Sequence, residues 1–186
     1  MESNPNPNSL KFVVNFDIAP QGDSFDYPDI ESAKNAPLAQ AIFNEFDFVE
    51  RVFIMNNFVT VTKQNEIEWF DVQNQIRDFI SQYLREEKPV FDGEVISELK
   101  EADKAVEEVD ELESKIRTVL DEYVKPAVEM DGGAITYDSF NEGTLKVQLQ
   151  GSCSGCPSSM VTLKSGIENL MKRMVPEVQT VEAIEG

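Results

Sequence analysis

Hydrophobic residues along the first half of the chain follow two periods, one typical of helices and one typical of strands. Apolar residues recur every three or four positions in two segments, which predicts amphipathic helices. Three further segments are rich in β-branched and aromatic residues, which favours strands. The expected elements are helices at 37–46 and 69–84 and strands at 9–17, 49–54 and 58–63. Together they predict a small α+β domain, with a hairpin where Asn56 and Asn57 join the last two strands.

The second half has a different pattern, which predicts the order helix, strand, strand, helix, strand. Apolar and polar side chains alternate in residues 144–150, as in a strand with one buried face. The expected strands are 134–140, 144–150 and 178–184, and the expected helices begin at Asp110 and at Pro157. Pro126 should kink the first helix, and Asp131-Gly132-Gly133 should end it. The second helix, which should run to Met174, has a predicted core stripe of Met160, Leu163, Ile167, Leu170 and Met174.

Amino-acid composition changes between the two halves, which indicates two separate cores. Of the 12 phenylalanines, all but Phe140 lie at or before Phe91, and the only tryptophan is Trp69. Most glycines, in contrast, follow residue 131. Between the halves lies an acidic stretch with helix-like spacing of apolar residues, which we interpret as a solvated linker. We therefore expect an α+β protein with small domains at 1–92 and 111–186 and a linker at 93–110.

Charge and composition exclude several classes of function. The chain has 16 basic and 35 acidic residues, a formal charge of −19, and no histidine. Such acidity argues against nucleic acid or an anionic membrane as a partner, because a phosphate backbone requires a basic surface. Without an imidazole, Ser-His-Asp and Cys-His catalysis and every His-ligated zinc site are excluded. The partners should be proteins or a metal.

The N-terminal residues show no targeting signal. They lack a basic segment followed by an apolar one, and they lack an arginine-rich amphipathic stretch. No window approaches the roughly 18 apolar residues that a membrane span requires. We therefore expect a cytoplasmic protein, in which a pair of cysteines serves metal binding or redox chemistry rather than a structural disulfide.

The two cysteines, Cys153 and Cys156, form a C-x-x-C motif between a predicted strand and a predicted helix. The N–H groups and dipole at the start of a helix favour a thiolate, which is the form that binds metals. Gly151 and Gly155 let the backbone approach whatever the sulfurs hold. The motif suits an iron–sulfur cluster, zinc or a dithiol redox pair. A thiol–disulfide oxidoreductase is less favoured because Pro157 follows the motif and no β-α-β unit is expected around it.

Counting ligands narrows the choice of site. Iron–sulfur clusters of the 2Fe-2S and 4Fe-4S types take four thiolates, and structural zinc takes four ligands. One chain supplies two cysteines and no histidine. A complete site, whether for a cluster or for a zinc ion that bridges a structural dimer, therefore needs Cys153 and Cys156 from two chains.

From residue 131 to residue 181 the sequence resembles the C-terminal domain of NifU-like (Nfu) proteins. The motifs that carry this resemblance are DGG at 131–133 and, from Gly151 onward, GSCSGCPSS followed by a helix. The first half is similar to the N-terminal Nfu domain, through NPNPNSLKFV, PLAQAIF, FVTVTK and a helix that opens with Trp69. Together these stretches cover most of the 186 residues.

This resemblance implies a carrier or scaffold for iron–sulfur clusters that is not an enzyme and has no catalytic residue. It implies a 4Fe-4S cluster held in a homodimer, with Cys153 and Cys156 of each chain as ligands. It also implies apo iron–sulfur client proteins and an upstream cluster scaffold as partners, and we expect the N-terminal domain to dock them. The residues that match the pattern by shaping the site are Gly132, Gly133, Gly151, Gly155 and Pro157.

Overall fold

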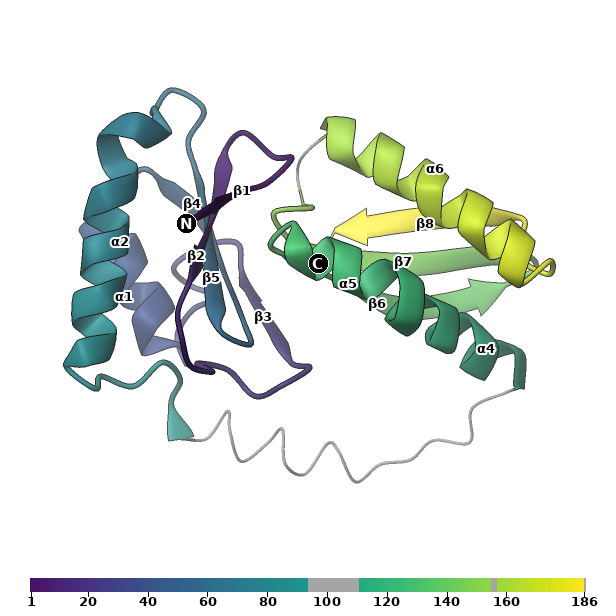
Figure 1. Cartoon of the computed structure of the whole chain (residues 1–186), viewed down its shortest axis with the longest axis horizontal. Helices are drawn as coiled ribbons and strands as arrows, with labels where there is room; N and C mark the ends of the chain where they lie inside the picture. Colours follow the sequence, from purple (N-terminus) through teal and green to yellow (C-terminus); the bar gives the residue numbers. More distant parts are fainter. Residues whose placement is uncertain (94–110, 155–156, 186) are drawn as a thin grey trace. The chain divides into compact units, whose positions relative to one another are not determined.

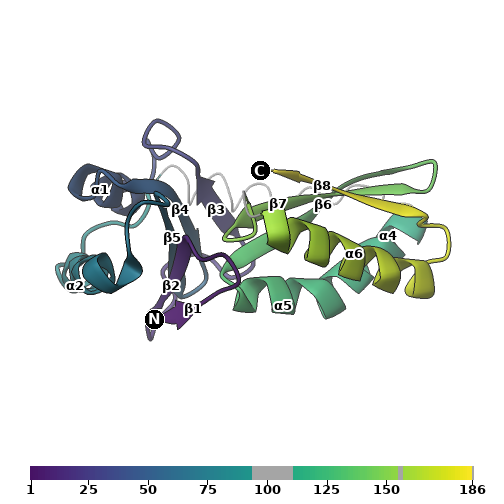
Figure 2. The ribbon, with the colours of Figure 1, turned by 90° about the horizontal axis from the view of Figure 1, so that it is seen from above.

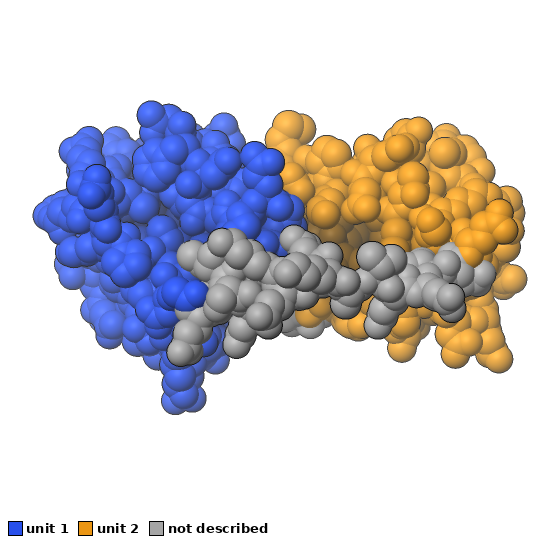
Figure 3. All heavy atoms as spheres, turned by 90° about the horizontal axis from the view of Figure 1, so that it is seen from below, with its two compact units in different colours: residues 1–3, 7–107 blue, residues 4–6, 108–186 orange. Residues whose placement is uncertain are grey.

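The computed structural model, drawn in Figure 1, describes residues 1–93, 111–154 and 157–185, without the side chains of 157–160 and 185. The chain falls into two compact units (Figure 3). The first unit consists of residues 1–3 and 7–107, and the second of residues 4–6 and 108–186. Both units contain helices and strands, which confirms the expected α+β class with two domains.

In the first unit, two helices cover one face of a five-stranded antiparallel sheet (Figure 2). The strands lie in the order β1-β2-β5-β4-β3. Their bounds are β1 Glu2–Ser3, β2 Ser9–Val13, β3 Ser24–Tyr27, β4 Val49–Met55 and β5 Phe58–Lys63, and those of the helices are α1 Pro37–Glu45 and α2 Trp69–Arg85. Every element expected for this half is present, although the strand expected at 9–17 ends at Val13.

The core of the first unit lies between α2, α1 and the sheet. On α2 the buried side chains recur at helical spacing and are Val72, Ile76, Ile80 and Tyr83. They pack with fully buried residues of the central strands, such as Val59 and Val61. Burial of each large aliphatic side chain stabilises the fold by about 1.5–3 kcal/mol, so this face holds the helix on the sheet.

β1 and β3 have no counterpart among the expected elements, and both lie at the edges of the sheet. They are too short for a hydrophobic period to be visible, and they form because each pairs with a longer neighbour. β3 also carries a buried carboxylate, Asp26, whose Oδ2 lies 2.6 Å from the Arg51 guanidinium of β4. This partner makes the buried charge of Asp26 tolerable.

In the second unit, the helices lie on one face of a three-stranded sheet with the order β6-β7-β8 (Figures 1 and 2). The helical segments are α4 Glu111–Val119, the π-helical turn η1 Leu120–Val124, α5 Lys125–Met130 and α6 Pro157–Met174. The strands are β6 Gly133–Asn141, β7 Thr144–Gly151 and β8 Thr180–Glu185. The expected order of helix, strand, strand, helix and strand is therefore present.

Two local features of this unit follow from single residues. The π-helical turn lies directly before Lys125 and Pro126, and because proline has no N–H to donate, the regular helix is interrupted there as expected. The β6–β7 hairpin turns at Glu142 and Gly143, which both have positive φ (46° and 82°). Such φ values are those of the two-residue type I′ turn that joins twisted strands.

β7, α6 and β8 form a β-α-β unit, because β8 runs parallel to β7. The expectation that no such unit surrounds the C-x-x-C motif was therefore wrong. A hydrophobic period identifies a strand but not the strand with which it pairs, and parallel pairing requires a crossover that α6 supplies. One of the two arguments against a redox pair is thereby lost, and the position of Pro157 after the motif remains.

The core stripe of α6 is displaced from the expected one at its C-terminal end. Ile167 and Met171 are 3% and 0% exposed, whereas Met174 is 39% exposed. Leu163 and Leu170 are half-buried beside this core, and the side chain of Met160 lies outside the described residues. Met174 is the last residue of α6, and the buried stripe ends one turn before it, at Met171.

The carboxylate of Glu168 attaches α6 to β8. One oxygen accepts a hydrogen bond from the Val181 N–H at 3.1 Å, and the other accepts one from Lys172 Nζ at 2.6 Å. The hydrogen bond from Lys172, and after it the one from the Val181 N–H, lower the pKa of the Glu168 carboxyl below its ordinary value. The bond to Val181 joins α6 to β8, whereas the bond from Lys172 lies within α6 itself.

The acidic linker expected at 93–110 lies, from residue 94 onward, outside the described residues. The residue bounds proposed for the two domains thus stay predictions. Among the helices that the structure describes, none is long and apolar enough to span a membrane.

Truncation of a core residue on α2 should show that this face stabilises the first unit. We expect Ile76→Ala to lower the free energy of unfolding by about 2–5 kcal/mol, because Ile76 is fully buried and its loss leaves a cavity. Phe70→Ala on the same helix is the matched control, since Phe70 is 85% exposed. Urea unfolding followed by the fluorescence of Trp69 measures both variants. Equal effects of the two substitutions would contradict this account of the core.

Candidate functional site

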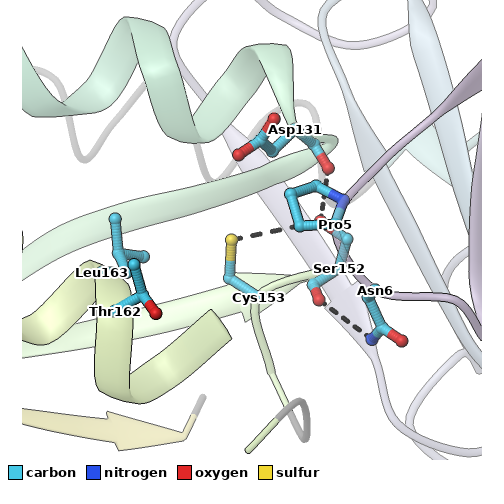
Figure 4. Close-up of a pocket in the computed structure, with 7 residues that line it drawn as sticks. All are labelled: Pro5, Asn6, Asp131, Ser152, Cys153, Thr162 and Leu163. Atoms are coloured by element: carbon cyan, nitrogen blue, oxygen red, sulfur yellow. Dashed lines mark hydrogen bonds between the residues drawn. The ribbon is translucent and has the colours of Figure 1, made fainter. Parts of the chain in front are cut away.

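The candidate site lies where β7 ends, in the loop of residues 152–154 (Figure 4). Cys153 in this loop is only 5% exposed. α6 begins at Pro157, as the sequence predicts, so the described part of the loop lies between a strand end and a helix start. Gly155 and Cys156 lie outside the described residues, and the roles expected of them stay predictions.

The pairing of β6 with β7 brings the Asp131-Gly132-Gly133 turn against this loop. In the antiparallel register Gly133 lies opposite Gly151. Gly132 has φ of 79° and Gly151 has φ of 68°, a region that glycine enters at little cost and other residues rarely adopt. The chain can therefore turn sharply on both sides of the strand pair, into β6 and out of β7.

Gly133 is a glycine for a different reason, namely the space beside Cys153. A Cβ built on Gly133 would lie 2.6 Å from the Gln150 carbonyl oxygen and 3.0 Å from Cys153 Sγ. Any side chain would therefore collide with the backbone of β7 and press on the thiol. Gly133 thus leaves the space that the Cys153 side chain occupies. This is how a glycine at this position can shape the loop.

Two serines on either side of Cys153 hold the loop, and sequence reasoning missed this role. The hydroxyl of Ser152 donates to the Asp131 carbonyl, and that of Ser154 donates to the Leu149 carbonyl at 2.9 Å. The Ser152 N–H also donates to the Gly132 carbonyl at 3.3 Å. Serine is so common in turns that its occurrence in G-S-C-S-G carries no signal by itself. The register of β6 and β7 sets Ser152 beside its acceptors, and the turn of the loop back onto β7 brings Ser154 to Leu149.

A cavity of about 340 Å³ lies beside Cys153 (Figure 4). Its lining includes Pro5 and Asn6, which group with the second unit, and Thr162 and Leu163 of α6. The side-chain amide of Asn6 donates to the Ser152 carbonyl at 3.0 Å. Asp131 and Ser152 line the cavity as well, so the space beside Cys153 has polar as well as apolar walls.

The donor set in the described part of the chain cannot by itself complete a metal site. No group of three or more His, Cys, Asp or Glu side chains that could hold a metal ion occurs among the described residues. The whole sequence has Cys156 as its only other thiol and has no histidine. What the loop can supply is soft thiolate ligands, which iron–sulfur clusters and zinc both accept.

Comparison with known protein families matches both units. A family model described as "Scaffold protein Nfu/NifU N terminal" matches residues 1–87, and one described as "NifU-like domain" matches residues 116–182. The two models together cover most of the chain, in the order that the sequence resemblance implies. The chain therefore belongs to the NifU-like (Nfu) family, with an N-terminal Nfu domain followed by a C-terminal NifU-like domain.

Individual relatives agree with this assignment. Proteins from Drosophila grimshawi and Drosophila erecta, both named "NFU1 iron-sulfur cluster scaffold homolog, mitochondrial", are 35% identical to this chain over 190 residues. The alignments cover 98% of this chain but 60% and 63% of the relatives, so it spans about three fifths of their length. A solution structure of a NifU-like protein from Saccharomyces cerevisiae is 25% identical, with a TM-score of 0.44, over 50% of this chain and 82% of that one.

The expectation of a cytoplasmic protein was wrong. The relatives are named as mitochondrial proteins, which points to mitochondria instead. The expectation rested on the lack of a targeting signal in the N-terminal residues, and that lack carries no weight in a chain that spans only part of its relatives.

A methyl group at Gly133 should disturb the loop. We expect Gly133→Ala to lower the free energy of unfolding by about 1–3 kcal/mol, because the added Cβ overpacks the space between Gln150 and Cys153. The matched control is Gly166→Ala on α6, where a Cβ meets nothing within 4 Å. Alanine there should leave stability unchanged or raise it by about 0.5–1 kcal/mol. Urea unfolding followed by circular dichroism measures both, and a Gly133→Ala chain as stable as the wild type would refute the packing argument.

Proposed function

We propose that the second unit binds a 4Fe-4S cluster between two copies of this chain and transfers it to apo iron–sulfur proteins. The observation that carries the proposal is the thiol count at the loop: Cys153 lies at the end of β7, and the chain has only two cysteines and no histidine. Four thiolates hold such a cluster, so Cys153 and Cys156 of two chains complete the set. Membership of the Nfu family favours a cluster over zinc, because the relatives are named iron–sulfur cluster scaffolds.

A shared site suits the release of the cluster better than its permanent retention. Each chain contributes half of the ligands, so thiolates of an acceptor protein can replace one pair at a time. The formal charge of −19 on each chain means that two copies repel each other. A dimer that depends on its cluster would then come apart as the cluster leaves.

Uptake of the cluster has to uncover Cys153, because this thiol is only 5% exposed without it. Residues 152–154 follow Gly151, the last paired residue of β7, so they can move while the strand stays in the sheet. The uptake step is thus a local change in the loop and requires no unfolding of the sheet.

In this proposal the protein is a carrier and not an enzyme, and it acts in mitochondria, as the names of its relatives indicate. Its partners are a second copy of the chain, an upstream scaffold that supplies the cluster, and apo iron–sulfur clients. The N-terminal domain, which we place at 1–92, docks these proteins, and the C-terminal domain at 111–186 holds the cluster.

Anaerobic reconstitution with iron and sulfide tests the proposal. We expect the thiolate-to-iron absorbance band of a cluster, with about four irons for every two chains. Binding of zinc in preference to iron would contradict the proposal and favour a zinc-bridged dimer. A chain that takes up no cluster but reduces disulfides rapidly would instead be a thiol–disulfide oxidoreductase.

Replacement of either cysteine should abolish the site and preserve the fold. We expect Cys153→Ser and Cys156→Ser each to lose cluster binding. Two chains with one thiolate each supply only two of the four ligands that the cluster needs. Far-UV circular dichroism should be unchanged, since Cys153 follows the end of β7 and lies outside the regular helices and strands. Ser165→Ala on the exposed face of α6 is the control and should bind a cluster as the wild type does. Retention of the cluster by either cysteine variant would contradict the assigned ligands.

A further inference from the structure

The two serines beside Cys153 are buried, although they lie in a loop and have polar side chains. Ser152 is 2% exposed and Ser154 is 5% exposed. A buried hydroxyl costs free energy unless it forms a hydrogen bond. Both hydroxyls do so, and they reach different parts of the second unit.

Ser152 attaches the front of the loop to the turn before β6. Its hydroxyl donates to the Asp131 carbonyl and its N–H donates to the Gly132 carbonyl at 3.3 Å. Two adjacent carbonyls of the turn therefore hold a single residue of the loop. Figure 4 shows Ser152 between Asp131 and Cys153, so this attachment lies directly next to the thiol.

Ser154 attaches the back of the same loop to β7. Its hydroxyl donates to the carbonyl of Leu149 at 2.9 Å, and its N–H donates to the Gly151 carbonyl at 3.1 Å. Leu149 is fully buried in the sheet, so this acceptor does not move unless the strand does. Cys153 is thus fixed from both sides, with one attachment to the turn and one to the strand.

We propose that Ser152 and Ser154 are positioning residues of the thiol site, whose hydroxyls keep Cys153 sheltered and correctly placed until the loop opens. Loss of either hydroxyl removes one hydrogen bond of the loop, to Asp131 or to Leu149, and frees one end of the loop. The thiol is then exposed more often. The role of the serines in cluster binding rests on the function proposed above, whereas the shelter of the thiol does not.

The shelter can be measured in the chain without a cluster. In a Cys156→Ser background the only thiol is Cys153. We expect Ser152→Ala and Ser154→Ala each to raise the rate of its reaction with excess 4,4′-dithiodipyridine, under anaerobic conditions, by about tenfold, the effect of one lost hydrogen bond. Ser165→Ala, at an exposed position on α6, is the matched control and should leave the rate unchanged.

The free energy of unfolding, measured in urea for each variant, separates positioning from general loss of stability. The proposal requires the thiol in each serine variant to react faster than its global unfolding constant allows, because the loop opens while the rest of the unit stays folded. A rate unchanged from the wild type, or one no faster than global unfolding allows, overturns it. If one serine variant does not fold, the other decides, because the two hydroxyls have independent acceptors.

A second measurement concerns the loaded protein and keeps the two proposals distinguishable. With both cysteines present, the serine variants should lose a reconstituted cluster to an iron chelator about tenfold faster than Ser165→Ala does, because the ligand is less well held. If the wild-type chain takes up no cluster, the proposed function fails, and the thiol rates still decide whether the serines shelter Cys153.

Discussion

The close approach of the Gly132-Gly133 turn to the end of β7 is the contact on which the site depends. It exists because β6 pairs with β7 in a register that sets Gly133 opposite Gly151. A side chain at Gly133 would press on the Cys153 thiol. The thiol can therefore pack here only because residue 133 is a glycine. The same register aligns the carbonyls that receive the Ser152 hydroxyl and N–H. One strand pairing thus shapes the loop, buries the thiol and provides its attachments.

A second constraint is chemical and comes from what the chain lacks. With two thiols and no imidazole, no single chain can surround a four-ligand metal centre with cysteine and histidine. The incompleteness of the site in one chain therefore explains why a second copy should be needed. Repulsion between two chains of charge −19 makes a cluster-independent dimer unfavourable. In the proposed function both properties favour release, since the assembly would last only as long as the cluster is present.

Much of this fold was predictable because its longer elements have clear periods. The face of α2 that contains Ile76 repeats at helical spacing, and β5 has the same bounds in the sequence and in the structure. The hydrophobic pattern could not show which strands pair with each other. The edge strands β1 and β3 and the parallel β7–β8 contact depend on partners that are distant in sequence. The motif identified Cys153 in the same way, whereas the acceptors of Ser152 and Ser154 emerged only from the three-dimensional course of the loop.

The central claim of this account is that the cluster lies between two chains. The mass of the anaerobically reconstituted protein under native conditions tests it most directly, because it reports the number of chains and the bound iron and sulfide together. The account predicts a species of two chains with one 4Fe-4S cluster, and a single chain once the cluster is removed. A single chain that carries a complete cluster would contradict it.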